Sequence, residues 1–366
     1  MTAARLVARC IRGLEPIAAT EILRAELGTV TGLGHREVRF QAAPPARWIE
    51  PRTADDVFLL AGRIPDIGRV RAGLGGLAEL TAALDLDSLL ARRRAYGGRG
   101  RLTGVEVSAS FLGRRNFNRY DAEDVIGSAL ARRLGVPYRS RRDGTPPPDL
   151  DGGWRLTLDG EHATLMLRIG LRPAHRRDYK RATIPGTLHP PVAAAMAILA
   201  DVLPGQRVLD PCCGAGTLLI EAERAQPLGR FQGYDLDPAA LRAARVNAAG
   251  STAVRVGAAD AGDLPLADGS VDRVVANPPW GAQVRAGGRL AGAPERWWAE
   301  IRRVLTPTGS AVVLIPDTGD LAAAIRYGLV PTYVQQVSLF GSRPSVVRLV
   351  PREPSGGSDD RIRRDH

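Results

Sequence analysis

Cysteine is scarce in this sequence of 366 residues, and the spacing of the three cysteines argues against structural roles for them. Cys10 stands alone, whereas Cys212 and Cys213 are adjacent. Adjacent cysteines suit neither a disulfide framework nor the spaced ligands of a zinc site. We therefore expect no bound metal, and the few thiols are typical of a reducing compartment.

Long apolar runs are also missing. No stretch approaches the roughly 18 uncharged apolar residues of a membrane span. Residues 1–12 carry arginines with no apolar run after them, so they do not have the pattern of a secretory signal. We expect no membrane association and a cytoplasmic location.

Lysine is nearly absent, because Lys180 is the single lysine among 50 basic residues. The net charge of +11 is unevenly placed, with +10 in residues 1–190 and +1 in residues 191–366. A coding bias explains arginine in place of lysine, but it does not explain this asymmetry. A basic half beside a balanced half is typical of a polyanion-binding module joined to a catalytic module.

The N-terminal half has the pattern of a mixed α/β fold. An amphipathic helix is predicted at Leu14–Leu27, between strands at Leu6–Cys10 and Glu37–Phe40. Further strands and helices follow without a regular order. At the other end of the chain, residues 351–366 are mostly Gly, Ser and charged residues, which predicts a disordered tail.

From Pro190 onward, short apolar runs alternate with helical segments, which is typical of a parallel, doubly wound sheet. The last two apolar runs, Tyr333–Leu339 and Val346–Val350, are joined by a segment too short for a parallel crossover. They therefore predict an antiparallel hairpin at one edge. The earlier predicted strands are Arg207–Asp210, Phe231–Asp235, Ala253–Val256, Val271–Ala276 and Ala311–Ile315.

The first of these strands ends in a glycine-rich turn, Asp-Pro-Cys-Cys-Gly-Ala-Gly-Thr at 210–217. Glycines let a ligand approach the backbone, and the following helix offers free N–H groups to an anion. A P-loop would need a lysine here, and a dinucleotide fingerprint would need three glycines at another spacing. A plain strand–helix turn is the remaining alternative. The candidate cofactor-binding residues in this turn are Asp210, Cys212, Gly214, Gly216 and Thr217.

Acidic side chains follow the second and third strands. Asp235, with Leu236 beside it, is placed to accept hydrogen bonds from both ribose hydroxyls of a nucleoside. Asp237 precedes a proline and is expected to cap the next helix. After the third strand, Asp260 could accept a hydrogen bond from an adenine amino group. Asp263 is the alternative acceptor, and a solvated loop acid is the plainer interpretation.

The fourth strand ends in Asn277-Pro278-Pro279-Trp280-Gly281, the most specific motif in the chain. A bland turn is the alternative. Its place after a buried parallel strand, three strands beyond a glycine-rich loop, favours a site at the carboxyl edge of the sheet. We therefore expect Asn277, Pro278, Pro279 and Trp280 to be catalytic, and Asn277 also to contact the cofactor.

These ordered motifs resemble those of S-adenosylmethionine-dependent amino-group methyltransferases. The N-terminal half, with Asn116–Tyr120 as its most suggestive part, is similar to the ferredoxin-like plus THUMP module of RNA-modifying enzymes. The linker Arg176–Arg181 and the following His189–Pro191 also resemble that family. The group most resembled is the THUMP-containing tRNA guanine-N2 methyltransferases. Their usual aromatic residue in the motif is tyrosine or phenylalanine, where this chain has Trp280.

The resemblance implies a domain order along the chain. It implies a Rossmann-like methyltransferase domain at 190–350, preceded by a ferredoxin-like subdomain at 1–45, a THUMP-like RNA-binding domain at 46–170 and a linker at 171–189. The implied cofactor is S-adenosylmethionine and the implied partner is RNA, most naturally tRNA, held by the basic N-terminal half.

An exocyclic amine is a poor nucleophile, so the expected mechanism centres on hydrogen-bond acceptors. The Asn277 side-chain oxygen and the Pro278 carbonyl would accept its two N–H groups and stabilise the charge that develops during attack. Trp280 would stack on the extruded base. Alternatives are methylation of guanine N2 in rRNA, of adenine N6 in DNA or of a protein glutamine, and an RNA-binding protein with an inactive methylase fold. A cytosine-C5 enzyme would need a nucleophilic cysteine beside the base.

Overall fold

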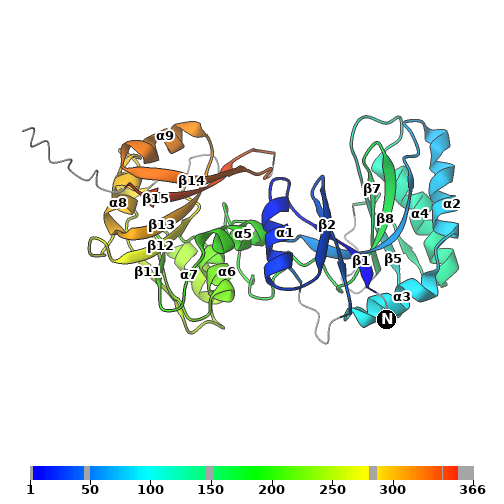
Figure 1. Ribbon diagram of the computed structural model, residues 1–366, viewed down its shortest axis with the longest axis horizontal. Coiled ribbons are helices and arrows are strands. Elements are labelled where there is room, and N and C mark those ends of the chain that lie inside the picture. Colours follow the sequence, from blue (N-terminus) through cyan, green and yellow to red (C-terminus); the bar gives the residue numbers. More distant parts are fainter. Residues whose placement is uncertain (1–2, 45–49, 145–151, 280–286, 340, 353–366) are drawn as a thin grey trace, which may run out of the picture. The chain divides into compact units, whose positions relative to one another are not determined.

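The computed structural model describes most of the chain, which folds into two compact units. Residues 1–178 together with 189–195 form the first unit, and residues 179–188 together with 196–366 form the second. Each unit is built on its own sheet (Figure 1). The structure describes residues 3–44, 50–144, 152–279, 287–339 and 341–352.

The first unit is built on one eight-stranded sheet of mixed direction. Its first strand in the chain, β1, lies inside the sheet and pairs antiparallel with β3 and with β4. Strand β5 instead runs parallel to β6 and β7. In order across the sheet the strands are β2 (Thr29–Gly34), β3 (Glu37–Ala42), β1 (Ala4–Arg9), β4 (Asp56–Pro65), β8 (His162–Arg168), β7 (Gly152–Leu158), β5 (Val105–Phe111) and β6 (Tyr138–Arg139).

Two helices of the first unit pack together beside β5. Helices α2 (Gly75–Ala82) and α4 (Arg119–Leu134) pack together on the same side of β5, β7 and β8 (Figure 1). Helix α4 begins sharply because Asn118 and Asp121 form a capping box, each side chain accepting the other's backbone N–H. The other described helical segments of this unit are α1 (Glu15–Arg24), the 3-10 turn η1 (Arg71–Leu74) and α3 (Leu86–Ala95).

The edge strand β2 was not predicted from the sequence. Its six residues include two glycines, a residue type depleted in strands. The β2–β3 register shifts between Val30 and Gly32, which places one glycine at a bulge. Glycine is tolerated at bulges, so β2 still completes the edge of the sheet beside β3.

The second unit confirms the predicted parallel sheet with an antiparallel edge. The five strands from β9 to β13 run parallel to one another. Strand β15 runs antiparallel to both β13 and β14. Across the sheet the order is β11 (Val254–Ala258), β10 (Arg230–Asp235), β9 (Arg207–Asp210), β12 (Val271–Ala276), β13 (Leu305–Ile315), β15 (Ser345–Pro351) and β14 (Leu329–Gln336).

Helices lie on both faces of this sheet, with α6 and α7 on one face and α8 and α9 on the other (Figure 1). The α8–α9 face holds a core in which Trp297, Trp298 and Ile301 pack against buried strand residues such as Val274 and Val313. The helical segments of the unit's described residues are α6 (Thr217–Ala225), α7 (Pro238–Asn247), η2 (Gly288–Leu290), α8 (Arg296–Val304) and α9 (Thr318–Arg326). Helix α5 (Pro190–Ala200) contributes residues to both units.

The edge hairpin is confirmed, but its first strand was predicted too late in the chain. Strand β14 begins at Leu329 and ends at Gln336, whereas the sequence predicted Tyr333–Leu339. The β14–β15 register shifts between Pro331 and Tyr333. A proline within an apolar run argues against a regular strand, yet it is accommodated at a bulge on an edge strand.

No helix in the described ranges is long and apolar enough to cross a membrane. Helix α4, with 16 residues, would extend about 24 Å at 1.5 Å per residue. The hydrocarbon core of a bilayer is roughly 30 Å thick. The predicted tail at 351–366 lies almost wholly outside the described residues.

Candidate functional site

The glycine-rich turn after β9 is held in shape by backbone hydrogen bonds. Asp210, only 1% exposed, accepts the Cys212 N–H on its Oδ1 at 3.2 Å. The Cys213 N–H donates to the Tyr234 carbonyl at 2.8 Å, which ties the turn to β10. Gly214 and Gly216 have φ values of 53° and 78°, a left-handed conformation that favours glycine. The turn therefore needs both glycines for its backbone path.

Helix α6 opens directly from this turn without a side-chain cap. Its first N–H groups have no partner within the helix, and they give the helix start a partial positive charge. Thr217, at the first helical position, is 3% exposed, and its hydroxyl has no hydrogen-bond partner among the described residues. An unpaired buried hydroxyl beside uncapped N–H groups fits a polar, anionic group such as the carboxylate of S-adenosylmethionine.

Asp235, at the carboxyl end of β10, lies beside the glycine-rich turn. Its Oδ2 accepts the Gly214 N–H at 2.8 Å, and its Oδ1 accepts the Asp237 N–H at 2.9 Å. The side chain is partly exposed, so each oxygen keeps an acceptor direction for a ligand. Asp237 instead caps α7 by accepting the Ala239 N–H at 2.8 Å, as predicted. Leu236 beside Asp235 is 48% exposed, so its side chain is accessible to a ligand.

Asp260 serves as a local anchor in the loop after β11. Its Oδ1 accepts the Gly262 N–H and its Oδ2 accepts the Arg289 N–H, both at 2.8 Å. Gly288 has a φ of 57°, and a Cβ there would lie 2.1 Å from Asp260 Oδ2. Asp263 pairs with the Arg289 guanidinium at 2.7 Å. Both acids are therefore engaged by the segment that ends the loop after β12.

Asn277 directly follows β12, at the same carboxyl edge of the sheet as Asp210 and Asp235. Its Nδ2 donates to the Gly186 carbonyl at 3.4 Å. A carbonyl can accept only from the amide nitrogen, so this contact turns Oδ1 away from Gly186. Pro278 is buried and Pro279 is partly exposed. Trp280, the fourth predicted catalytic residue, lies outside the described residues.

The two adjacent cysteines lie in the turn, and their thiols are poorly ionised. Burial, with the nearby carboxylates of Asp210 and Asp235, raises the pKa of both the Cys212 and the Cys213 thiol. Burial and the neighbouring Asp235 carboxylate also raise the pKa of Asp210 well above its ordinary value. A cysteine nucleophile, as a cytosine-C5 enzyme needs, does not fit this environment. Within the described ranges, no group of His, Cys, Asp and Glu could hold a metal ion.

The sequence did not predict that residues 179–188 form part of this site. This segment, expected to be a linker, groups with the second unit. We call it the strap. Ile184 Cδ1 lies 3.8 Å from the position of a Cβ on Gly214, and the Gly186 carbonyl meets Asn277. Asn247, at the end of α7, holds the strap and was also missed, because no local motif marks it.

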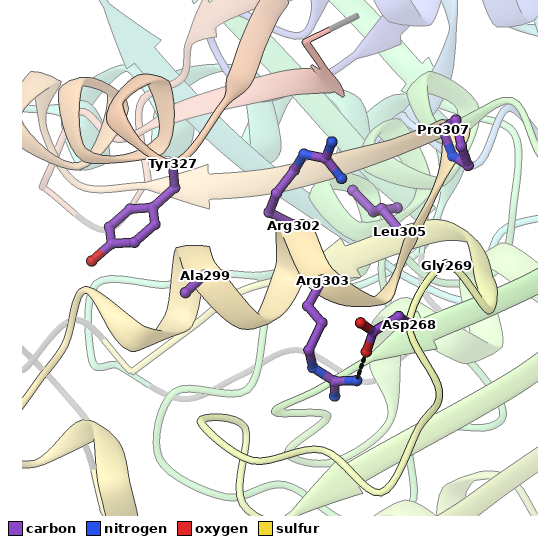
Figure 2. Close-up of a pocket in the computed structure, with 8 residues that line it drawn as sticks. All are labelled: Asp268, Gly269, Ala299, Arg302, Arg303, Leu305, Pro307 and Tyr327. Carbon is purple, nitrogen blue, oxygen red and sulfur yellow. Dashed lines mark hydrogen bonds and ion pairs between the residues drawn. The ribbon is translucent and has the colours of Figure 1, made fainter. Parts of the chain in front are cut away.

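A separate cavity of about 520 Å³ lies at the amino-terminal ends of β12 and β13. Figure 2 shows its lining, in which the Arg303 guanidinium pairs with Asp268 at 2.7 Å. Arg303 also binds the Glu300 carboxylate and the Leu266 carbonyl. Because the glycine-rich turn and Asn277 occupy the opposite ends of the strands, this cavity is not part of the candidate site.

The known proteins that this chain resembles are methyltransferases. A family model described as "RMKL-like, methyltransferase domain" matches residues 177–339. A tRNA (guanine(6)-N2)-methyltransferase of Thermus thermophilus is 36% identical over 249 residues, covering 66% of this chain and 71% of the relative. A tRNA (guanine(10)-N2)-dimethyltransferase of Methanothermobacter thermautotrophicus is 38% identical over 242 residues, covering 63% of this chain and 70% of the relative.

A solved structure agrees over nearly the whole chain. The crystal structure of TrmN from Thermus thermophilus superposes with a TM-score of 0.71 at 28% sequence identity. The match covers 95% of this chain and 99% of the other, so it includes both units.

Proposed function

The chain belongs to the family of S-adenosylmethionine-dependent RNA guanine-N2 methyltransferases that share an RMKL-like methyltransferase domain, and from this premise we propose that it methylates N2 of a guanine in tRNA. The relatives named for tRNA guanine-N2 methylation support the choice of substrate and atom.

The observation that carries this proposal is the orientation of the Asn277 amide. With Nδ2 on the Gly186 carbonyl, Oδ1 is left as an acceptor at the carboxyl edge of the sheet. An acceptor in this position can take one N–H of the guanine amino group, and the Pro278 carbonyl can take the other. Both contacts strengthen as positive charge develops on the attacking nitrogen, which lowers the barrier. Trp280 would stack on the flipped guanine.

The cofactor residues divide into those that touch the ligand and those that shape the turn. S-adenosylmethionine supplies a methyl group on a positively charged sulfur. We assign the ribose hydroxyls to Asp235, the adenine face to Leu236 and the amino-acid end to the start of α6 with Thr217. Asp210 and Cys212, together with Gly214 and Gly216, act by setting the path of the turn. Asp260 acts on the adenine side of the site.

The first unit offers an arginine-rich surface that suits RNA phosphates. Around the start of α4, the Arg119 guanidinium stacks on the Tyr120 ring at 4.7 Å and the Arg142 guanidinium lies 5.7 Å from the same ring. Arg114, in the preceding loop, is also exposed. Arginine stacked on a partly exposed aromatic ring such as Tyr120 can bind phosphate while the ring meets a base.

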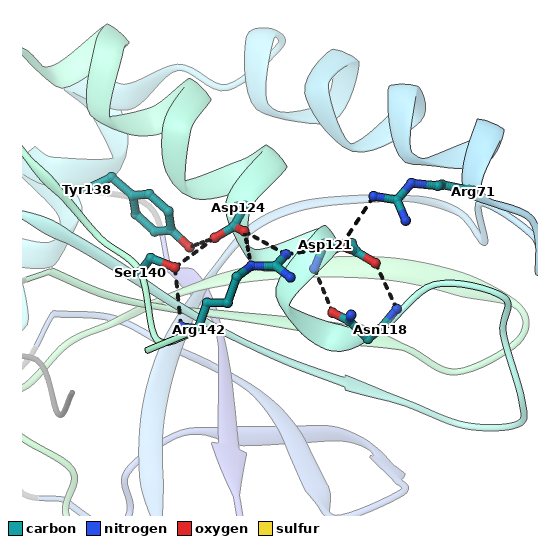
Figure 3. Close-up of polar contacts among 7 residues, drawn as sticks. All are labelled: Arg71, Asn118, Asp121, Asp124, Tyr138, Ser140 and Arg142. Carbon is teal, nitrogen blue, oxygen red and sulfur yellow. Dashed lines mark hydrogen bonds and ion pairs between the residues drawn. The ribbon is translucent and has the colours of Figure 1, made fainter. Parts of the chain in front are cut away.

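The two acidic side chains of this surface, Asp121 and Asp124, pair with Arg142 and Arg71, and Arg114 and Arg119 are the positive charges in excess. Asp121 accepts from Arg142 at 3.0 Å and Asp124 from the same guanidinium at 2.8 Å (Figure 3). Arg71 lies 3.5 Å from Asp121 and is 69% exposed. The Asn118 N–H and Arg142 keep the pKa of Asp121 below its ordinary value, so Asp121 stays ionised and paired.

An RNA substrate and three free cysteines suit the cytoplasm, which we propose as the location.

The product identifies the function. Purified full-length protein is incubated with labelled S-adenosylmethionine and either total tRNA, rRNA or duplex DNA, and digested nucleosides are separated by mass spectrometry. We expect N2-methylguanosine from tRNA. N6-methyladenine from DNA would replace the proposal with the adenine alternative, and labelled rRNA alone would replace tRNA as the substrate. No product from any nucleic acid would favour an inactive methylase fold.

The role of the arginine-rich surface is tested by charge and salt. The Arg114→Ala/Arg119→Ala variant should bind tRNA more weakly, and its salt dependence should be less steep by about 0.7–0.9 per lost phosphate contact. Arg326→Ala, which removes an exposed arginine of α9 in the second unit, is the matched control. Equal binding by both variants would remove this surface from the RNA interface.

A further inference from the structure

We propose that Asn247 is a positioning residue that couples the glycine-rich turn to the catalytic amide of Asn277 through the strap, an inference that rests on the proposed function. Asn247 is the last residue of α7 and is 4% exposed. It is not expected to touch cofactor or RNA. Its effect on the reaction would be transmitted by the backbone that it holds.

The Asn247 carboxamide makes its full set of hydrogen bonds. Its Oδ1 accepts the N–H groups of Arg181 and Ala182, each at 2.9 Å. Its Nδ2 donates to the carbonyls of Ala182 and Ala215, also each at 2.9 Å. A carboxamide offers two donors and two main acceptor directions, so each is used. No other side chain of this size can satisfy two N–H groups and two carbonyls at once.

These four bonds join two segments that carry different parts of the site. Arg181 and Ala182 belong to the strap, whereas Ala215 lies in the glycine-rich turn between Gly214 and Gly216. Asn247 therefore fixes the strap and the turn relative to each other. A side chain also joins the strap to the turn, because Ile184 of the strap lies beside Gly214.

The strap is also fixed at its start, so Asn247 is one of two anchors. The Tyr179 hydroxyl donates to Oε1 of Glu221 in α6 at 2.6 Å, and this contact is buried. The Arg224 guanidinium lies 4.8 Å from the centre of the Tyr179 ring. Between these anchors and Gly186 there are only a few residues, and the positions of Arg181 and Ala182 limit where the Gly186 carbonyl can lie.

The Gly186 carbonyl sets the orientation of the catalytic amide. It is the acceptor for Asn277 Nδ2, and this bond keeps Oδ1 directed away from the strap. At 3.4 Å the bond is long, so a small retreat of the strap would break it. The amide could then rotate and present a donor where the guanine amino group needs an acceptor. A misplacement of about 1 Å at a reacting centre can cost about a hundred-fold in rate.

The test is a double-mutant cycle in the full-length protein. Asn247→Ala should lower the single-turnover rate of tRNA methylation, at saturating cofactor and RNA, by about ten- to a hundred-fold. Because the effect is transmitted through Asn277, the same substitution should cause little further loss in an Asn277→Ala background. Additive losses in the double variant would overturn the coupling.

Stability is controlled separately. Arg303→Ala removes several partly buried hydrogen bonds at the opposite ends of the strands, so it should lower the melting temperature without lowering the single-turnover rate. A comparable rate loss in Arg303→Ala would show that Asn247 acts through general stability. A normal single-turnover rate for the folded fraction of Asn247→Ala would also contradict the proposal, because Asn247 would then have no positioning role.

A conservative variant gives a further readout. Asn247→Asp keeps an acceptor for Arg181 and Ala182 but sets a carboxylate against the carbonyls of Ala182 and Ala215. Its rate should recover as pH falls, because a protonated carboxyl can donate to one of those carbonyls. A pH profile identical to that of the unmodified protein would contradict this. If the unmodified protein methylates no RNA, the proposed function fails, and that result is distinct from failure of the cycle.

Discussion

The hydrogen bonds of Asp235 allow an estimate of how far its replacement should lower the affinity for the cofactor. The carboxylate accepts the Gly214 N–H at 2.8 Å and the Asp237 N–H at 2.9 Å, and it retains acceptor directions for two ribose hydroxyls. Asp235→Ala removes the acceptor for the cofactor and one support of the turn. A hydrogen bond to a charged group contributes about 1.5–3 kcal/mol. We therefore expect affinity for S-adenosylhomocysteine to fall about ten- to a hundred-fold.

The isosteric variant separates the charge from the shape. In Asp235→Asn, the carboxamide oxygen can accept one of the two backbone N–H groups. Its amide nitrogen must then face the other N–H, of Gly214 or of Asp237, with no bond between them. Asp235→Asn should therefore also bind the cofactor more weakly, although it fills the same space.

Asp237→Ala is the matched control, since it removes a carboxylate two residues away. Asp237 caps α7 through the Ala239 N–H, so its loss should cost about 1 kcal/mol of stability and leave cofactor affinity nearly unchanged. Calorimetric titration of each full-length variant with S-adenosylhomocysteine, with melting temperatures alongside, distinguishes the two acids. Unchanged affinity in folded Asp235→Ala, or equal loss in Asp237→Ala, would refute the assignment of Asp235 to the ribose.

Three further expectations concern Asn277, Asp210 and the free cysteines of both units. Asn277→Ala should lower single-turnover methylation by about 10²–10³ while cofactor affinity changes little; a near-normal rate would contradict its catalytic role. Because burial raises the pKa of Asp210, the folded state binds a proton more tightly than the unfolded state, and stability should fall as pH rises above the ordinary value of 3.8. Melting curves of Asp210→Asn against the unmodified protein should show a difference in favour of the variant that grows with pH. Raised pKa values at Cys10, Cys212 and Cys213 predict slow alkylation of the native protein at neutral pH, and intact mass should show rapid labelling only after unfolding.

The parts of the site that were predictable lie where local sequence carries the physical cause. Parallel strands buried on both faces appear as continuous apolar runs, so the residues that follow them mark the carboxyl edge of the sheet. Asp235 and Asp237 could be told apart because a proline after Asp237 indicates a helix start. The roles of these residues toward cofactor and RNA stay predictions.

The strap could not be predicted in this way, because its contacts join residues distant in the sequence. Asn247 meets Ala182 across 65 residues, and Asn277 meets Gly186 across 91. Asn247 belongs to no pattern of apolar spacing or turn chemistry. Pro185-Gly186 predicts a turn, but nothing in it indicates that the Gly186 carbonyl meets Asn277. Asp260 shows the converse case: the sequence identified the residue, but not that its carboxylate holds the backbone of Arg289.

The inner position of β1 constrains how the first unit can form during synthesis. Strand β1 pairs with β4, and β4 then pairs with β8, where Arg168 reaches Asp56 across 112 residues of chain. Until β8 leaves the ribosome, one edge of β4 has no partner, and such an edge can pair with other chains. Contacts of this sequence separation form slowly. A nascent chain paused before residue 162 would therefore be a preferred client of chaperones, while the second unit has not yet been made.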